Sequence, residues 1–249
     1  MNNALTTGMI ASGVLAAMHG TAAAAVIVSS HEAQKGYFVE AECTPEFPEA
    51  HFNECTCSAD VVYPQIESED MRFEAWNEAI KEESKADMCA GVLRTDEVPE
   101  NVKSPNGYSQ SFDVVYQDDD VLSLLVEFWM YGAGAAHGNY SHDGHVLLLN
   151  SGKQVKLWEQ LSDEQRAKAN AYIHAQFKGE LKDSVFESEA NSDTAYLTME
   201  DCNGCTAYFS ADGWVVSFNP YAVGPYAAGY IDVTLPEAIA PAPQTLVKG

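Results

Sequence analysis

Basic side chains are scarce in this sequence. Lys and Arg together number 13 against 37 Asp and Glu in 249 residues, which gives a formal net charge of −24. A surface with this charge repels nucleic acid and anionic lipid headgroups and attracts cationic partners. We therefore expect no nucleic-acid partner. Excess negative charge also serves solubility alone, so a basic protein partner is compatible with it but is not required by it.

Common catalytic and cofactor-binding signatures are missing as well. The chain has no Gly-x-Ser-x-Gly elbow and no His-Glu-x-x-His helix motif. Its many acidic residues offer numerous carboxylate pairs, but no pair has a context typical of a glycosidase. The Gly132-Ala-Gly134 turn lacks the lysine and the following helix of a phosphate-binding loop. We expect no cofactor.

Long apolar runs are absent too. A short apolar stretch at residues 9–18 is followed by small residues up to Ala25, a pattern typical of a secretory signal peptide. Its amino-terminal region departs from the usual pattern because it has no Lys or Arg. Gly, His and Thr interrupt the stretch, which argues against a membrane span. We predict a signal peptide at residues 1–25, no span after its cleavage, and a periplasmic or secreted protein.

All six cysteines follow the expected cleavage site, and an even number in an exported chain predicts disulfides. Cys202 and Cys205 enclose an Asn-Gly turn and precede a strand-like segment. A helix start, which would activate a redox thiol, is not indicated there. We expect these two cysteines to form a local structural disulfide, and the other four to pair among themselves: Cys43, Cys55, Cys57 and Cys89.

Hydrophobic periodicity predicts an α+β fold, with a mostly antiparallel sheet and two main helices packed against it. One helix should begin at residue 68 or 69 and run to about 88, burying Phe73, Trp76, Ile80 and Met88. The other should span 163–181, begin at a capping box of Ser162 and Gln165, and bury Ala167, Ala171, Ile173 and Phe177. The expected strands cover 35–42, 58–63, 108–116, 121–131, 145–149, 195–199, 206–210, 214–218 and 229–235.

Three histidines suggest an alternative function. His137, His142 and His145, with Asp143 as a fourth ligand, could surround Zn²⁺ in a metal-dependent envelope hydrolase. In an extended segment, however, His142 points away from Asp143 and His145. The ligands converge only if the chain bends sharply at Gly144. Because this spacing is weak evidence, we expect no metal.

The segment 214–236 contains two strand-like stretches joined by a connection with two Pro-Tyr pairs. These are Pro220-Tyr221 and Pro225-Tyr226. Proline fixes the backbone, and tyrosine is a good anchor at protein interfaces. The connection could clamp the fold internally or face a partner, and in the second case Pro220, Tyr221, Pro225 and Tyr226 are the predicted partner-binding residues. It has no nucleophile, carboxylate or histidine, which favours a binding module over an enzyme.

This segment, the stretch 122–137 and the following Gly152, Lys153 and Leu157 resemble the C-terminal domain of the RsiV-like family. The family includes envelope anti-sigma factor ectodomains that sense lysozyme and accessory domains of peptidoglycan deacetylases. The resemblance covers roughly residues 108–235, and residues 43–90 only loosely. It implies an exported module that binds lysozyme, another cationic envelope protein or cell-wall peptidoglycan without catalysis. We expect no direct control of a sigma factor, because no sigma-binding segment or membrane span is evident.

These observations predict four regions. They are the signal peptide at 1–25, a Cys-rich strand and helix part at 26–106, the RsiV-like domain at 107–236 and a disordered tail at 237–249.

Overall fold

Seven strands form the larger of two sheets in the computed structural model, which describes residues 26–39, 55–68, 71–84, 89, 92–95 and 105–243. The strand order is β3-β1-β2-β4-β5-β6-β7, and all neighbours are antiparallel except β2 and β4. The strands are β1 (Ile27–Val39), β2 (Thr56–Glu67), β3 (Val92–Thr95), β4 (Asn106–Gln117), β5 (Val121–Tyr131), β6 (Asn139–Leu148) and β7 (Lys153–Val155).

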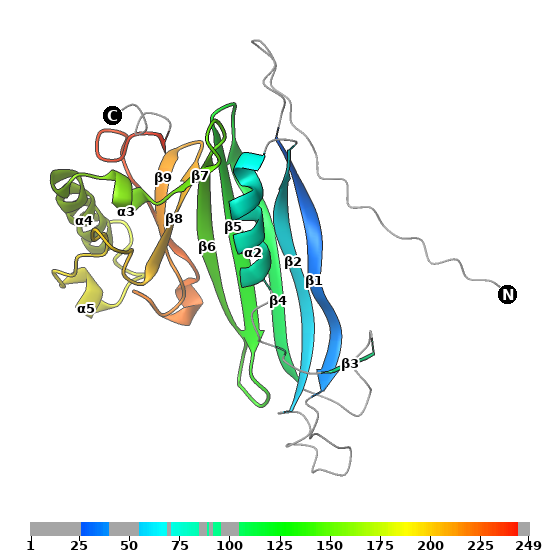
Figure 1. The fold of residues 1–249 in the computed structure, drawn as a ribbon. Helices are drawn as coiled ribbons and strands as arrows, with labels where there is room; N and C mark the ends of the chain where they lie inside the picture. Colours follow the sequence, from blue (N-terminus) through cyan, green and yellow to red (C-terminus); the bar gives the residue numbers. More distant parts are fainter. Residues whose placement is uncertain are drawn as a thin grey trace.

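A second, three-stranded antiparallel sheet is built near the C-terminus in the order β10-β9-β8. Its strands are β8 (Cys205–Ser210), β9 (Gly213–Phe218) and β10 (Ile231–Thr234). The helical elements are η1 (Met71–Phe73), α2 (Glu74–Glu83), α3 (Leu157–Gln160), α4 (Asp163–Lys178), α5 (Glu187–Ala190) and η2 (Tyr226–Ala228). The small sheet and α3 to α5 lie together beyond β6 (Figure 1). These elements confirm the predicted α+β class.

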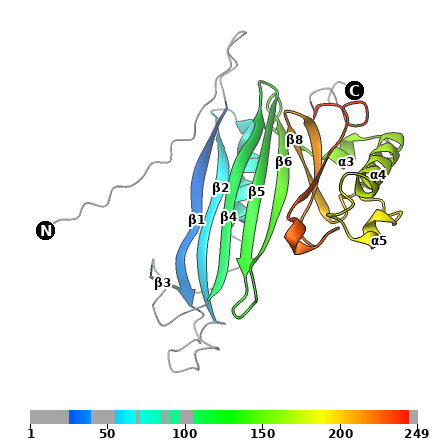
Figure 2. The same cartoon turned by 180° about the vertical axis from the view of Figure 1, so that it is seen from behind.

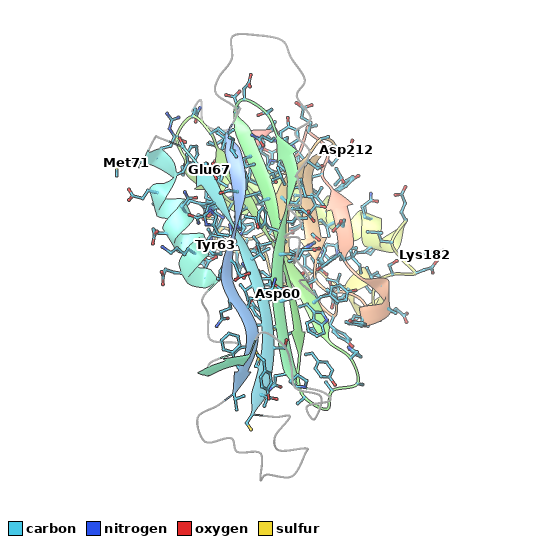
Figure 3. All side chains as sticks on the ribbon, turned by 90° about the vertical axis from the view of Figure 1, so that its right-hand side faces the viewer. Asp60, Tyr63, Glu67, Met71, Lys182 and Asp212 are labelled. Atoms are coloured by element: carbon cyan, nitrogen blue, oxygen red, sulfur yellow. A yellow bond between two sulfur atoms is a disulfide. The ribbon has the colours of Figure 1, made fainter. Side chains whose placement is uncertain are left out.

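The two faces of β5 belong to two different cores, because successive side chains in a strand point to opposite sides. Leu122 and Leu124 pack with Trp76 and the rest of the α2 face. Val121 instead joins the core made by α4 and the small sheet. In Figure 3, η1 and α2 accordingly lie on one side of the large sheet, whereas Lys182 and Asp212 of the C-terminal part lie on the other.

Helix α4 begins at Ser162 with the predicted capping box, in which Ser162 and Gln165 satisfy each other's backbone amides. Its buried face differs from the prediction at two of four positions. Ile173 and Phe177 are buried as expected, whereas the predicted Ala167 and Ala171 are exposed, and Arg166 and Ala169 are buried instead. A hydrophobicity pattern does not predict a buried arginine. Arg166 can be buried because its guanidinium donates to the carbonyls of Trp158 and Leu161.

Several other boundaries differ from the sequence-based expectation, and β1 begins at Ile27, eight residues before its predicted start. Residues 195–199 form no strand, since only Leu197 makes an isolated bridge, to Cys202. β6 begins six residues before the predicted start at 145. The tail is ordered as far as the structure describes it, to residue 243. Ala240 is buried in the α4 core and the Trp214 indole donates to the carbonyl of Pro241, so the expected disorder from 237 is wrong there.

For the first helix, Phe73, Trp76 and Ile80 are buried as predicted, in η1 and α2. The predicted buried position Met88 and the predicted signal peptide lie outside the described residues. The boundary proposed at 106/107 falls at the start of β4, and one sheet joins the parts on either side of it.

The structure contains the disulfides Cys57–Cys89 and Cys202–Cys205, and Cys55 is disulfide-bonded too. The first closes the start of β2 onto Cys89, which follows α2, and the second closes the turn before β8. Cys202–Cys205 is the local pair that the sequence favoured. Across the described ranges, no helix has the length and apolar character needed to cross a membrane.

Substitution of Gly144 in β6 tests how closely the two sheets pack. A Cβ at Gly144 would lie 2.3 Å from the carbonyl oxygen of Ala207 in β8, so Gly144→Ala should lower the free energy of unfolding by about 1–3 kcal/mol. Gly132→Ala is the matched control, because a Cβ there meets nothing within 4 Å. Urea unfolding of both variants measures the difference. Equal midpoints for the two variants would contradict the close approach.

Candidate functional site

Five aromatic side chains gather where the β9–β10 connection meets the start of β6. The Tyr226 ring lies 4.3 Å from the His137 ring, 5.2 Å from that of Tyr140 and 5.6 Å from that of Tyr221, measured between centroids. Tyr140 lies a further 5.2 Å from Tyr230. We call these five residues the aromatic patch: His137, Tyr140, Tyr221, Tyr226 and Tyr230. Figure 2 shows η2, which begins at Tyr226, beside β6.

Hydrogen bonds hold the patch in place. The Tyr226 hydroxyl donates to the carbonyl of Gly138 at 2.9 Å, and His137 Nδ1 donates to the same oxygen at 2.8 Å. At the start of the connection, the Asn219 side chain accepts from the backbone N–H of His142 and donates to its carbonyl. The connection is therefore held at two points, by β6 at Asn219 and by the residue before β6 at Tyr226.

The four Pro-Tyr residues of the connection have different roles. Tyr221 is 53% exposed, and it is the one non-glycine residue in the described ranges with a positive φ, at 71°. Such a conformation costs a tyrosine free energy, so the surrounding structure must impose it. Tyr226 is half-buried and Pro225 is exposed. Pro220 is buried, which corrects its assignment as a partner-facing residue.

His142 contacts both the aromatic patch and buried residues behind it. Its ring stacks on Tyr230 at 3.8 Å with an interplanar angle of 8°, and its Nε2 donates to Ser217 Oγ at 2.6 Å. The Ser217 hydroxyl donates in turn to Asp232, which also accepts from the Tyr208 hydroxyl at 3.2 Å. The three residue types of a hydrolase triad are present, but here serine lies between histidine and aspartate, whereas a triad needs histidine in the middle. Ser217 is also fully buried, so its hydroxyl does not face a substrate.

The three histidines of the zinc hypothesis do not converge. His142 faces the small sheet, whereas the His145 ring lies 6.0 Å from that of Trp76 in α2, on the other side of the large sheet. His145 Nδ1 accepts from the Gln154 amide at 3.1 Å. His137 is exposed in the turn before β6. Since β6 runs straight through Gly144, the bend required for a shared metal is absent, and the zinc interpretation is corrected.

The patch lies on a part of the chain without Lys or Arg. No Lys or Arg occurs at residues 104–152 or 183–247, which together supply β4, β5, β6, the small sheet and the whole patch. Carboxylates do occur there. Burial raises the pKa of Tyr230, and the nearby charge of Glu127 raises it further. Within these elements, no Lys or Arg offsets the charge of the carboxylates.

One exposed aromatic side chain next to the patch was not expected from the sequence. Trp129 in β5 is 41% exposed and pairs in register with Tyr140 of β6. Its ring plane is parallel to that of Tyr131 within 8°, with the centroids 6.1 Å apart. The alternation of β5 would have placed both on the face opposite Leu122 and Leu124. In Figure 2 this face of the large sheet is seen, and no helix from the described parts of the chain crosses it.

Residues 158–238 match the family model described as "Protein of unknown function (DUF3298)". Two solved structures of DUF3298 family proteins are similar to the chain. The one from Bacteroides fragilis is 15% identical, with a TM-score of 0.55 over 86% of this chain and 91% of the other. The one from Pseudomonas aeruginosa is 12% identical, with a TM-score of 0.47 over 86% of this chain and 92% of the other. The first likeness shows the fold alone. No curated protein matches the sequence.

The buried histidines predict a loss of stability in acid. Burial lowers the pKa of His145, an effect that Lys156 reinforces and that Asp143 and Glu83 oppose; burial also lowers the pKa of His142. Below the ordinary value of 6.5, the unfolded chain therefore binds protons that the folded chain does not, so stability falls as pH drops.

We expect the urea concentration at the unfolding midpoint to decrease when the pH is lowered from about 7.5 to about 5.5. The decrease should be smaller in His145→Gln. A slope in His145→Gln as steep as that of the wild type would refute the assignment.

Proposed function

We propose that this protein is an exported binding module of the bacterial envelope, of the RsiV-like type, that recognises a cationic protein such as lysozyme without catalysis. The observation that carries the proposal is the aromatic patch itself. It combines exposed tyrosine with a surface whose own elements, β4 to β6 and β8 to β10, supply carboxylates but no Lys or Arg.

The geometry of the patch suits protein recognition. Tyrosine buries a large area at low conformational cost, and it is common among the residues that dominate interface energetics. The hydrogen bonds of Tyr226 and Asn219 fix the connection before any partner arrives, which lowers the entropy lost on binding. Tyr221, held with a positive φ at the surface, is the most exposed ring of the connection.

Charge favours a basic protein over a cell-wall polymer as the partner. At a net charge of −24 the protein is attracted to a basic protein such as lysozyme, and anionic polymers are repelled. The disulfides support an oxidising compartment, as expected for an exported chain. Lysozyme inhibition would then follow from obstruction of its cleft and would need no chemistry from this chain.

Titration of the oxidised protein with lysozyme by calorimetry tests this function. We expect one-to-one binding that persists at physiological salt. Tyr221→Ala and Tyr226→Ala should each weaken it about tenfold, because truncation of an interface anchor typically costs more than 1 kcal/mol. Tyr226→Phe keeps the ring and removes only the hydrogen bond to Gly138.

Met71→Ala is the matched control, because Met71 is 75% exposed on the α2 side of the large sheet. It should bind as the wild type does. Binding confined to low salt would mean that net charge alone attracts lysozyme, and the proposal would fail. Unchanged binding in folded Tyr221→Ala and Tyr226→Ala would remove the patch from the interface.

A further inference from the structure

Trp129 lies on a floor of two glycines. A Cβ at Gly138 would lie 2.4 Å from the indole Nε1, and a Cβ at Gly107 would lie 2.7 Å from Cζ3 at the opposite edge of the ring. The indole therefore spans the two glycines, with its five-membered ring over Gly138 and its six-membered ring over Gly107. Any other residue at either position would push the ring away from the sheet.

This arrangement leaves a flat aromatic surface open to solvent. Trp129 is 41% exposed although its ring rests against backbone, and the Tyr131 ring stacks parallel to it with the centroids 6.1 Å apart. The Tyr131 hydroxyl is held by the carbonyl of Ala135 at 3.1 Å. We call Trp129 and Tyr131 the indole platform. It adjoins the aromatic patch, because Tyr140 is the β6 partner of Trp129 in the sheet.

Carboxylates flank the platform on the same face. Glu127 precedes Trp129 by two residues in β5, so its side chain leaves the same side of the strand. Asp60 of β2, labelled in Figure 3, pairs with Ser109, which pairs in turn with Trp129. Lys35 of β1 lies 4.0 Å from Asp60, so that cation is already shared with a carboxylate. β4, β5 and β6 supply no Lys or Arg of their own.

We propose that the indole platform is a subsite for an arginine side chain of a cationic protein partner, an inference that rests on the proposed function. A guanidinium is planar and weakly hydrated, and it stacks on aromatic faces, of which indole is the best cation acceptor. The carboxylates add attraction for its charge. A neutral sugar ring can also stack on an indole, but it gains nothing from the surrounding negative charge, so charge favours the guanidinium.

A matched pair of small probes tests the subsite without any protein partner. The oxidised full chain, labelled with ¹⁵N in its four tryptophans, is titrated with N-acetyl-arginine amide and, separately, with its neutral isostere N-acetyl-citrulline amide. We expect the Trp129 indole N–H signal, assigned by its loss in Trp129→Leu, to shift with arginine and not with citrulline. Equal shifts with the two probes, or a shift with chitotetraose alone, would overturn the proposal.

Gly138→Ala provides a second variant that keeps the indole but lifts it from its floor. The arginine-dependent shift should disappear in this variant while the other tryptophan signals stay in place. A shift as large as that of the wild type would mean that the flat seat plays no part, and would overturn the proposal.

Lysozyme binding then separates the subsite from the broader function. Trp129→Leu should weaken lysozyme about two- to fivefold, as expected for an exposed cation–π contact, whereas Phe186→Leu, at a ring 40% exposed beside α5, should not. If wild-type protein fails to bind lysozyme but retains the arginine-specific shift, the proposed function fails and the subsite stands. If lysozyme binds wild-type and Trp129→Leu protein equally and arginine behaves as citrulline does, the subsite fails and the function stands.

Discussion

β6 approaches β8 so closely at Gly144 that only hydrogen fits between the strand and the carbonyl oxygen of Ala207. Polar contacts surround this point. The Thr206 hydroxyl accepts from the Gly144 N–H and donates to Asp143, and the Ser123 hydroxyl accepts from the Phe209 N–H. These hydrogen bonds satisfy backbone groups that the junction of the two sheets buries. Each such group would cost about 1–3 kcal/mol of stability if it were left without a partner. The two sheets can therefore pack as one body.

The position of the aromatic patch follows from this junction. Tyr140 comes from the large sheet, Tyr230 directly precedes β10, and Tyr226 comes from the connection between β9 and β10. Asn219 joins that connection to His142, two residues before Gly144 and its close contact. A shift of the small sheet along β6 would separate the rings. A binding surface assembled from two sheets thus needs the same close packing that stabilises the fold.

The buried network behind the patch has a cost. His142, Ser217 and Asp232 place an imidazole and a carboxylate close to the core, where burial disfavours the charged imidazole and lowers its pKa. The network is stable because each group has a partner, including the Tyr208 hydroxyl, whose pKa burial and Asp232 raise to about 12. The network fixes the orientation of the His142 ring, which stacks on Tyr230 and so holds this member of the aromatic patch in place.

The sequence by itself determined the local features. Periodicity, the capping box at Ser162 and the Asn-Gly turn between Cys202 and Cys205 specify α4, the main strands and a local disulfide, because these depend on neighbours in the chain. The absence of Lys and Arg from residues 104–152 and 183–247 is equally visible in the sequence, and it marks the negative surface.

Only the tertiary structure decided which residues meet. It buried Pro220, separated His142 from His145, and seated Trp129 over Gly107 and Gly138. These outcomes depend on strand register and on the packing of two sheets. Both are set by contacts between segments far apart in the chain, which no local pattern encodes.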